Sequence, residues 1–145
     1  MNVIGVTMEK IFKGTLKKDR RTKNLCKRLQ PGDIALIAHK NLDELAGQEL
    51  AERGVKAVIN VDNTISGEYP ALGTKVLLDQ GIYILDNVGE NVYSLLVEGE
   101  TVTIVGNSIY CGEELLGQGR VISRQFLKKK LDQAENNLKQ QLDLF

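Results

Sequence analysis

Short apolar runs that do not alternate with polar residues recur through the first half of the chain. Three of them are the strongest, at Asp33–Ala38, Val55–Val61 and Ile82–Leu85. Runs of this length, rich in β-branched residues, are typical of strands that are covered on both faces. Between them, apolar residues recur at helical spacing. The pattern therefore predicts a β-α-β-α-β unit with parallel strands joined by crossover helices.

The two helices of this unit have recognisable ends. Asn41 is the candidate N-cap of the first helix, with Glu44 three residues later in capping-box register. Gly54 follows the last turn of this helix as a C′ residue. Gly81 does the same for a second helix, which we predict over Leu72–Gln80.

Weaker patterns precede this unit. Lys10–Leu16 alternates polar and apolar residues and predicts an edge strand, whose lysines discourage unwanted pairing. Arg21–Leu29 predicts a short basic helix, closed by the turn at Pro31-Gly32.

The pattern changes again after the third strong run. Val88–Val97 predicts a short helix, and three strand-like pieces follow it. These pieces are Thr101–Val105, Ser108–Cys111 and Leu115–Ile122. Gly106-Asn107 predicts a tight hairpin between the first two. We therefore expect antiparallel strands to close the α/β unit.

The last segment, Arg124–Phe145, predicts a helix with a narrow apolar stripe. Alternating spacings of four and three residues form an a/d seam over about three heptads. The seam consists of Leu127, Leu131, Ala134, Leu138, Gln141 and Phe145. It favours either a partner helix, and thus a homodimer through residues 127–145, or packing on its own domain. We divide the chain into a flexible start at 1–9, an α/β domain at 10–122, and a linker or coiled-coil helix at 123–145.

Composition excludes several classes of protein. The 145 residues, 42% of them hydrophobic, can bury a core without disulfides or metals. The 19 basic residues balance 19 acidic ones, which argues against a nucleic-acid partner. No apolar run is long enough to span a bilayer. Cys26 and Cys111 are isolated and the chain has one histidine, so we predict no metal site and no cofactor, and a reduced, cytoplasmic setting.

Charge is nevertheless unevenly distributed. Lys10–Arg28 holds nine Lys or Arg residues against the single acid Asp19. The candidate basic surface consists of Arg20, Arg21, Lys23, Lys27 and Arg28. A solvated face is the simpler interpretation, and contact with phosphate, acidic lipid or an acidic partner is the alternative.

The most distinctive loop is Ile65–Gly73, ISGEYPALG, between a predicted strand and a predicted helix. Such loops collect ligands because free helix N–H groups converge there, although a plain crossover has the same geometry. The candidate ligand-binding residues are Ser66, Gly67, Tyr69 and Gly73, with Asp86 and Asn87 after the neighbouring strand. Glycine motifs that bind nucleotides are absent, and His39 has no evident catalytic partner, so we predict no catalytic residue.

Several stretches resemble the SteA-type cytokinetic ring protein family, bacterial proteins with a thiamine-pyrophosphokinase-like domain. The combination of a DRRTK block with an ISGxYPxLG loop is specific to this resemblance, which spans nearly the whole chain from Gly14. The similar stretches are Asp19–Leu25, Leu29–Ala35, Ile65–Gly73, Asp86–Gly89 and Gln140–Phe145.

The resemblance implies that this chain is an N-terminal module. In the family a linker helix follows, then the thiamine-pyrophosphokinase-like domain, then hydrophobic helices that anchor the full-length protein at the cytoplasmic side of the membrane. The chain stops inside the implied linker helix. The family is linked to septum formation and cell separation, which implies protein partners among the division proteins.

A more distant resemblance is to the swivelling β/β/α domain of phosphoenolpyruvate-utilising enzymes. Its landmarks are similar to Pro31–Ile34, Ala57–Asn60, Gly81-Ile82 and Glu98–Ile104. Leu72 stands near the place of that family's phosphohistidine. Leucine cannot carry a phosphoryl group, so the resemblance extends to the fold and not to phosphotransfer.

Together these observations predict an α/β fold of swivelling β/β/α type, with a parallel βαβαβ core, closing antiparallel strands and a C-terminal linker helix. The expected function is a non-catalytic interaction or regulatory module of a cell-division-associated protein. The alternative is a phosphate or nucleotide site on the Ser66–Gly73 loop, contributing to a thiamine-pyrophosphokinase-like activity of the full-length protein.

Overall fold

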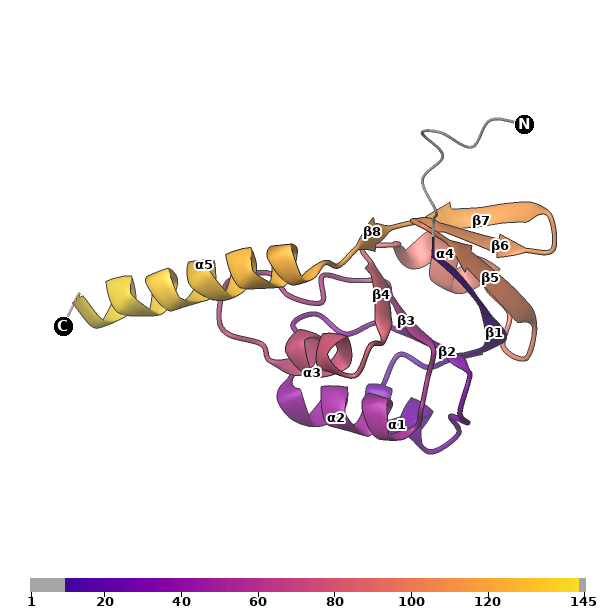
Figure 1. Ribbon diagram of the computed structural model, residues 1–145, viewed down its shortest axis with the longest axis horizontal. Coiled ribbons are helices and arrows are strands. Elements are labelled where there is room, and N and C mark those ends of the chain that lie inside the picture. The colour runs from indigo at the N-terminus through magenta and orange to yellow at the C-terminus, as the bar shows by residue number, and fades with distance from the viewer. Residues whose placement is uncertain (1–9, 144–145) are drawn as a thin grey trace.

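The computed structural model describes residues 10–143 and contains one eight-stranded sheet with helices on both faces (Figure 1). The sheet order is β7-β6-β5-β1-β2-β3-β4-β8. The strands are β1 Ile11–Lys18, β2 Ile34–Ile37, β3 Ala57–Asn60, β4 Tyr83–Asp86, β5 Thr101–Val105, β6 Ser108–Cys111, β7 Glu114–Gln118 and β8 Arg120–Val121. The helices are α1 Thr22–Cys26, α2 Glu44–Glu52, α3 Gly73–Asp79, α4 Glu90–Leu95 and α5 Arg124–Asp143. The start predicted to be flexible, 1–9, lies outside the described residues.

The predicted fold class is confirmed. Strands β1 to β4 are parallel neighbours, β5 to β7 and β8 pair antiparallel at the two ends, and a long helix ends the described chain. The non-alternating runs arise because the parallel strands are buried on both sides. In β2, Ala35 and Ile37 face one apolar cluster with α1, α2 and α3, while Ile34 and Leu36 face a second cluster with α4.

The edge-strand prediction for Lys10–Leu16 is wrong. Strand β1 lies inside the sheet, parallel to β2 on one side and antiparallel to β5 on the other. Lysines on a strand indicate that side chains on one face reach solvent. They do not indicate whether the backbone of the strand is hydrogen-bonded on both sides. The second neighbour, β5, lies more than eighty residues later in the chain. The residues near β1 therefore do not predict this pairing.

The single strand predicted over Leu115–Ile122 is two strands on opposite edges of the sheet. β7 pairs with β6, while β8 pairs antiparallel with β4. Only Gly119 separates them, so the sheet curls until its two edges approach each other. A Cβ atom on Gly119 would lie 2.6 Å from the Asp86 carbonyl oxygen, so a glycine is needed where the chain crosses β4.

The predicted N-cap of α2 also differs from the structure. Asp43 is the N-cap, and its carboxylate accepts a hydrogen bond from the Ala46 N–H. Asn41 adopts a left-handed conformation with φ 55°, and its side chain accepts from the Ser66 N–H instead. Both residue types suit a cap, and contact with a distant loop decided between them.

Of the two arrangements that the sequence left open, a partner helix stays a prediction, and packing on the domain is found for part of helix α5. Its first half packs on the domain, since Leu127 and Ala134 are buried and Arg124 pairs with Asp79 of α3. Its second half extends beyond the α/β body (Figure 1). There Leu138 is 50% exposed, and Phe145 lies outside the described residues. None of the helices within residues 10–143 has the length and apolarity to span a membrane.

The contact between α2 and α3 provides a test of the packing. A Cβ atom on Gly47 of α2 would lie 2.8 Å from both the Cα and the carbonyl oxygen of Gly73. We expect Gly47→Ala to destabilise the fold by about 1–3 kcal/mol through overpacking, although alanine is the better helix former. Chemical denaturation measures this. Gln48→Ala, on the exposed side of the same helix, is the control and should leave the midpoint nearly unchanged.

Candidate functional site

Polar side chains gather where the parallel strands end. Because carboxyl ends of parallel strands share one edge of the sheet, residues after β2, β3 and β4 come together there. Asn60, fully buried at the end of β3, holds the turn after β2: its amide accepts from the His39 N–H (3.0 Å) and donates to the His39 carbonyl (2.9 Å). The same amide donates to the Thr64 hydroxyl (3.1 Å).

Asp86, a predicted ligand residue, is a buried structural carboxylate. It has no exposed surface, and Arg120 of β8 binds both of its oxygens, each at 3.0 Å. It also accepts from the Thr64 N–H at 2.8 Å. The Arg120 guanidinium donates further to Asn63 and lies 4.4 Å from the centre of the Phe126 ring. This network connects β4, β8 and α5 with Asn63 and Thr64, which lead into the loop Ile65–Gly73, from here on called the central loop.

The loop Ile65–Gly73 is held from two sides by side chains. Asn41 binds the Ser66 N–H, and Asn137 of α5 donates to the Gly67 carbonyl at 3.0 Å. Gly67 has φ 88°, and a Cβ atom there would lie 2.7 Å from the Gln133 side-chain oxygen. The loop therefore forms part of the surface on which α5 packs.

The predicted ligand residues are not brought into one cavity. Asp86 is enclosed by Arg120, and Gly73 packs against Leu42 at the start of α3. Tyr69 is 53% exposed, and Asn87 is exposed as well. The role of these residues in ligand binding stays a prediction.

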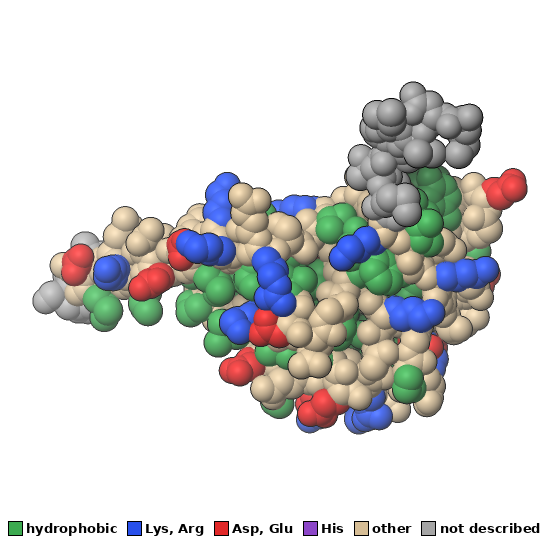
Figure 2. Space-filling view, in the orientation of Figure 1, with side chains coloured by type: hydrophobic (Ala, Val, Ile, Leu, Met, Phe, Trp, Pro, Cys, Tyr) green, Lys and Arg blue, Asp and Glu red, His purple; other side chains and the backbone are tan. Residues whose placement is uncertain are grey.

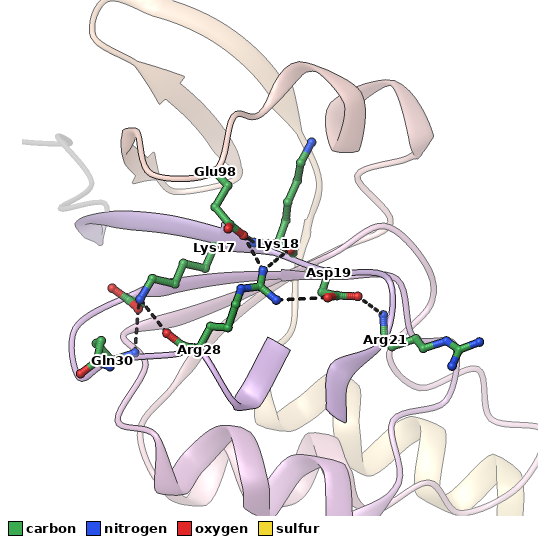
Figure 3. Close-up of polar contacts among 8 residues, drawn as sticks. Lys17, Lys18, Asp19, Arg21, Arg28, Gln30 and Glu98 are labelled. Atoms are coloured by element: carbon green, nitrogen blue, oxygen red, sulfur yellow. Dashed lines mark hydrogen bonds and ion pairs between the residues drawn. The ribbon is translucent and has the colours of Figure 1, made fainter. Parts of the chain in front are cut away.

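The candidate basic surface is partly neutralised. Arg28 pairs with Asp19 (3.1 Å) and Glu98 (2.6 Å), and Figure 3 shows its guanidinium between these carboxylates. Arg20 pairs with Glu90 of α4 at 2.7 Å and stacks over the Tyr93 ring. Arg20 and Arg28, which flank α1, thus connect it to α4 and the segment after α4 on the other face of the sheet.

The partner carboxylates respond to these contacts. The Arg21 backbone N–H, followed by Arg28, lowers the pKa of Asp19, and the Lys18 backbone N–H, followed by Arg28, lowers the pKa of Glu98. A pKa lowered on folding means that the charged form stabilises the fold at higher pH. This contribution is lost as pH falls through the lowered values.

Arg21, Lys23 and Lys27 differ from Arg20 and Arg28, because their side-chain cations form no hydrogen bond or ion pair within residues 10–143. Figure 3 shows the Arg21 side chain pointing away from the Asp19–Arg28 pair. Arg21 and Lys23 line an open cleft of about 460 Å³ between α1, α2 and the end of β2. We call it the His39 cleft. The remaining lining residues are Arg20, Thr22, Ala38, His39, Lys40, Asp43, Leu45, Ala46 and Glu49.

Sequence reasoning missed Arg120. It lies inside a predicted strand, and the signal that it needs a partner is a lone charge between Gly119 and an apolar residue. His39 has no evident catalytic partner in the sequence, and its contacts with Thr22 and Asn60 come from α1 and β3, which no local pattern reveals. No group of three or more His, Cys, Asp or Glu side chains in the described part of the chain is placed to hold a metal ion.

Comparisons with known proteins add the following. No family model matches the chain, and no curated protein matches it. The chain is similar to the crystal structure of 3-isopropylmalate dehydratase (leuD) from Methanocaldococcus jannaschii, with 13% identity, a TM-score of 0.48, and coverage of 92% of this chain and 98% of that one. It is also similar to a potential metal-dependent hydrolase with cyclase activity, with 21% identity, a TM-score of 0.49, and coverage of 77% and 63%.

The Asp86–Arg120 pair can be tested directly. We expect Arg120→Met to destabilise the fold by about 3 kcal/mol, because it leaves a buried carboxylate without its counter-ion. Arg20→Met is the matched control: it breaks an ion pair whose members, Arg20 and Glu90, are 54% and 64% exposed. Its melting temperature should hardly change. Equal losses of stability in the two variants would contradict a special role for the buried pair.

Proposed function

We propose that this chain is a non-catalytic interaction and regulatory module of a cell-division-associated protein of the SteA type, with a thiamine-pyrophosphokinase-like domain elsewhere in the full-length protein. The module acts in the cytoplasm, and the full-length protein is anchored at the cytoplasmic side of the membrane. The resemblance to this family comes from the DRRTK and ISGxYPxLG stretches, and the exposed apolar stripe of α5 supports an interaction role.

The observation that carries the proposal is the uncovered end of the α5 stripe. Leu127 and Ala134 are buried on the domain, and spacings of four continue the same side of the helix through Leu138 and Leu142. These two leucines are 50% and 64% exposed. An apolar stripe that begins in the core and continues past its edge is typical of a helix that meets a second helix.

The central loop extends this surface. Glu68 borders a shallow depression of about 420 Å³ with Asn137, Gln140 and Gln141 of α5. Tyr69, next to Glu68, is 53% exposed. Figure 2 shows apolar side chains along the lower side of the extending helix. We call the surface made of Tyr69, Leu138, Leu142 and the residues of the depression the loop–α5 face.

The loop's hydrogen bonds favour this proposal over the alternative of a phosphate or nucleotide site on Ser66–Gly73. The Ser66 N–H and the Gly67 carbonyl are bound by Asn41 and Asn137, which leaves these groups unavailable to a ligand. A protein helix is the occupant that an amphipathic surface of this kind fits. Division proteins are the proposed source of that helix, and a second copy of this chain is a further candidate.

The first test is made in a bacterium that carries the full-length protein. We expect Leu138→Glu combined with Leu142→Glu to impair septum completion or cell separation, because two charges on the apolar stripe oppose helix docking. Light microscopy scores chain length, and immunoblotting checks that the variant accumulates normally. The control is Leu115→Glu, at a 50% exposed leucine on β7, far from α5 in the fold. Normal separation in the double variant, or the same defect in the control, would refute the role of this face.

The second test concerns self-association. If a second copy occupies the loop–α5 face, sedimentation velocity should show a concentration-dependent dimer for the unchanged chain and a monomer for the Leu138→Glu, Leu142→Glu variant. At roughly 1.5–3 kcal/mol for each fully buried leucine, two leucines per chain support a weak dimer. A monomer at all concentrations would exclude the homodimer through 127–145.

A further inference from the structure

We propose that the His39 cleft binds the phosphate monoester group of a small organic molecule or a lipid headgroup. Arg21, Lys23 and His39 hold the phosphate, and Ala38, Leu45 and Ala46 contact the attached organic part. This site is separate from the loop Ser66–Gly73. The inference goes beyond the proposed interaction role and does not depend on it.

The position of the cleft in the sheet is the first argument. β1 and β2 are parallel neighbours, so their carboxyl ends lie at the same edge of the sheet. Ligands of open α/β sheets bind outside the carboxyl ends of the strands. The segments that line the cleft, Arg20–Lys23 and Ala38–Lys40, directly follow β1 and β2.

The second argument is that His39 is held in a fixed orientation. Asn60 binds both its backbone N–H and its carbonyl, and the Thr22 hydroxyl lies 2.8 Å from its Nδ1 atom. When the Thr22 hydroxyl donates to Nδ1, the ring proton is on Nε2. Nε2 lies 3.4 Å from an Asp43 oxygen, which is longer than a good hydrogen bond. This N–H is therefore available to a stronger acceptor that enters the cleft.

The third argument is the distribution of charge. The charges of Arg20 and Lys40 are met by Glu90 and Glu68, which do not line the cleft. The Arg21 and Lys23 side-chain cations form no hydrogen bond or ion pair within residues 10–143. A phosphate monoester carries up to two negative charges and offers several acceptor oxygens to such a pair, and arginine binds it in a bidentate manner.

Two acidic residues, Asp43 and Glu49, also line the cleft. Asp43 caps α2 through the Ala46 N–H. Glu49, like Lys23, lines a second cleft as well, together with Lys27, Arg53 and Glu52. The volume of about 460 Å³ is within the range of small-molecule sites, and Leu45, 63% exposed in the first turn of α2, supplies apolar surface for the organic part.

The test uses the 145-residue chain with phenyl phosphate as the probe. Titration followed by backbone amide NMR should shift residues 19–23 and 38–41 and give a dissociation constant. Phenyl sulfate, with one negative charge, should bind more weakly. Phenyl phosphate that leaves these amides unchanged would overturn the proposal.

A pair of matched variants tests the cations. Arg21→Gln with Lys23→Gln should weaken phenyl phosphate binding by about tenfold or more, because two charge-assisted hydrogen bonds are lost. Lys27→Gln with Lys129→Gln removes the same net charge from exposed positions outside the cleft and should leave the affinity within about twofold. Equal weakening in both pairs would mean general charge attraction and would overturn the site. Melting temperatures confirm that all variants are folded.

A vesicle arm distinguishes the two sources of the phosphate group. Co-sedimentation with phosphatidylcholine vesicles that contain phosphatidic acid, displaced by phenyl phosphate and lost in the Arg21→Gln, Lys23→Gln variant, would identify a lipid headgroup. Binding of soluble phenyl phosphate without vesicle binding would identify a soluble metabolite. An acidic peptide that shifts the same amides when phenyl phosphate does not would refute the proposal in favour of a protein ligand.

Discussion

The ion pair between the buried carboxylate of Asp86 and the partly exposed Arg120 is the contact on which the rest of the arrangement depends. A carboxylate without solvent contact costs several kcal/mol unless it is fully paired, and here Arg120 and the Thr64 N–H satisfy it. Arg120 lies in β8, so the pair fixes the curled edge of the sheet against β4. The same guanidinium stacks on Phe126, which sets where α5 begins to cross the domain.

A second constraint connects the two surfaces to which we assign functions. The turn at His39–Asn41 contributes His39 and Lys40 to the His39 cleft, while Lys40 pairs with Glu68 and Asn41 binds the Ser66 N–H of the central loop. The loop in turn holds α5 through Gly67 and Asn137. A ligand that competes with Glu68 for Lys40 would therefore act on the residues that support the loop–α5 face.

The candidate site was predictable as a set of residue types but not as a geometry. The basic residues of α1 were all visible in the sequence. Which of them are free was not, because the acids that neutralise Arg20 and Arg28 lie 70 residues further along the chain. In the folded chain Glu90 pairs with Arg20 and Glu98 pairs with Arg28. Within the described residues, Arg21 and Lys23 are left as the unpaired cations of the His39 cleft. His39 was recognised as lying at a strand end, while its clamp by Thr22 and Asn60 required contacts between separate elements.

Local patterns in the sequence are sufficient to predict the α/β class and the parallel core. Runs such as Ile34–Ile37 carry local information, because a strand buried on both faces must be apolar at every position. Glycines after helices, such as Gly54 and Gly81, are local for the same reason, since a left-handed backbone at the helix end favours glycine whatever surrounds it. Tertiary structure decided the internal place of β1, the division of Leu115–Ile122 between two edges, and the capping of α2 by Asp43. Each of these features is stabilised by contact with a segment that is distant in the sequence. The residues around it therefore do not reveal it.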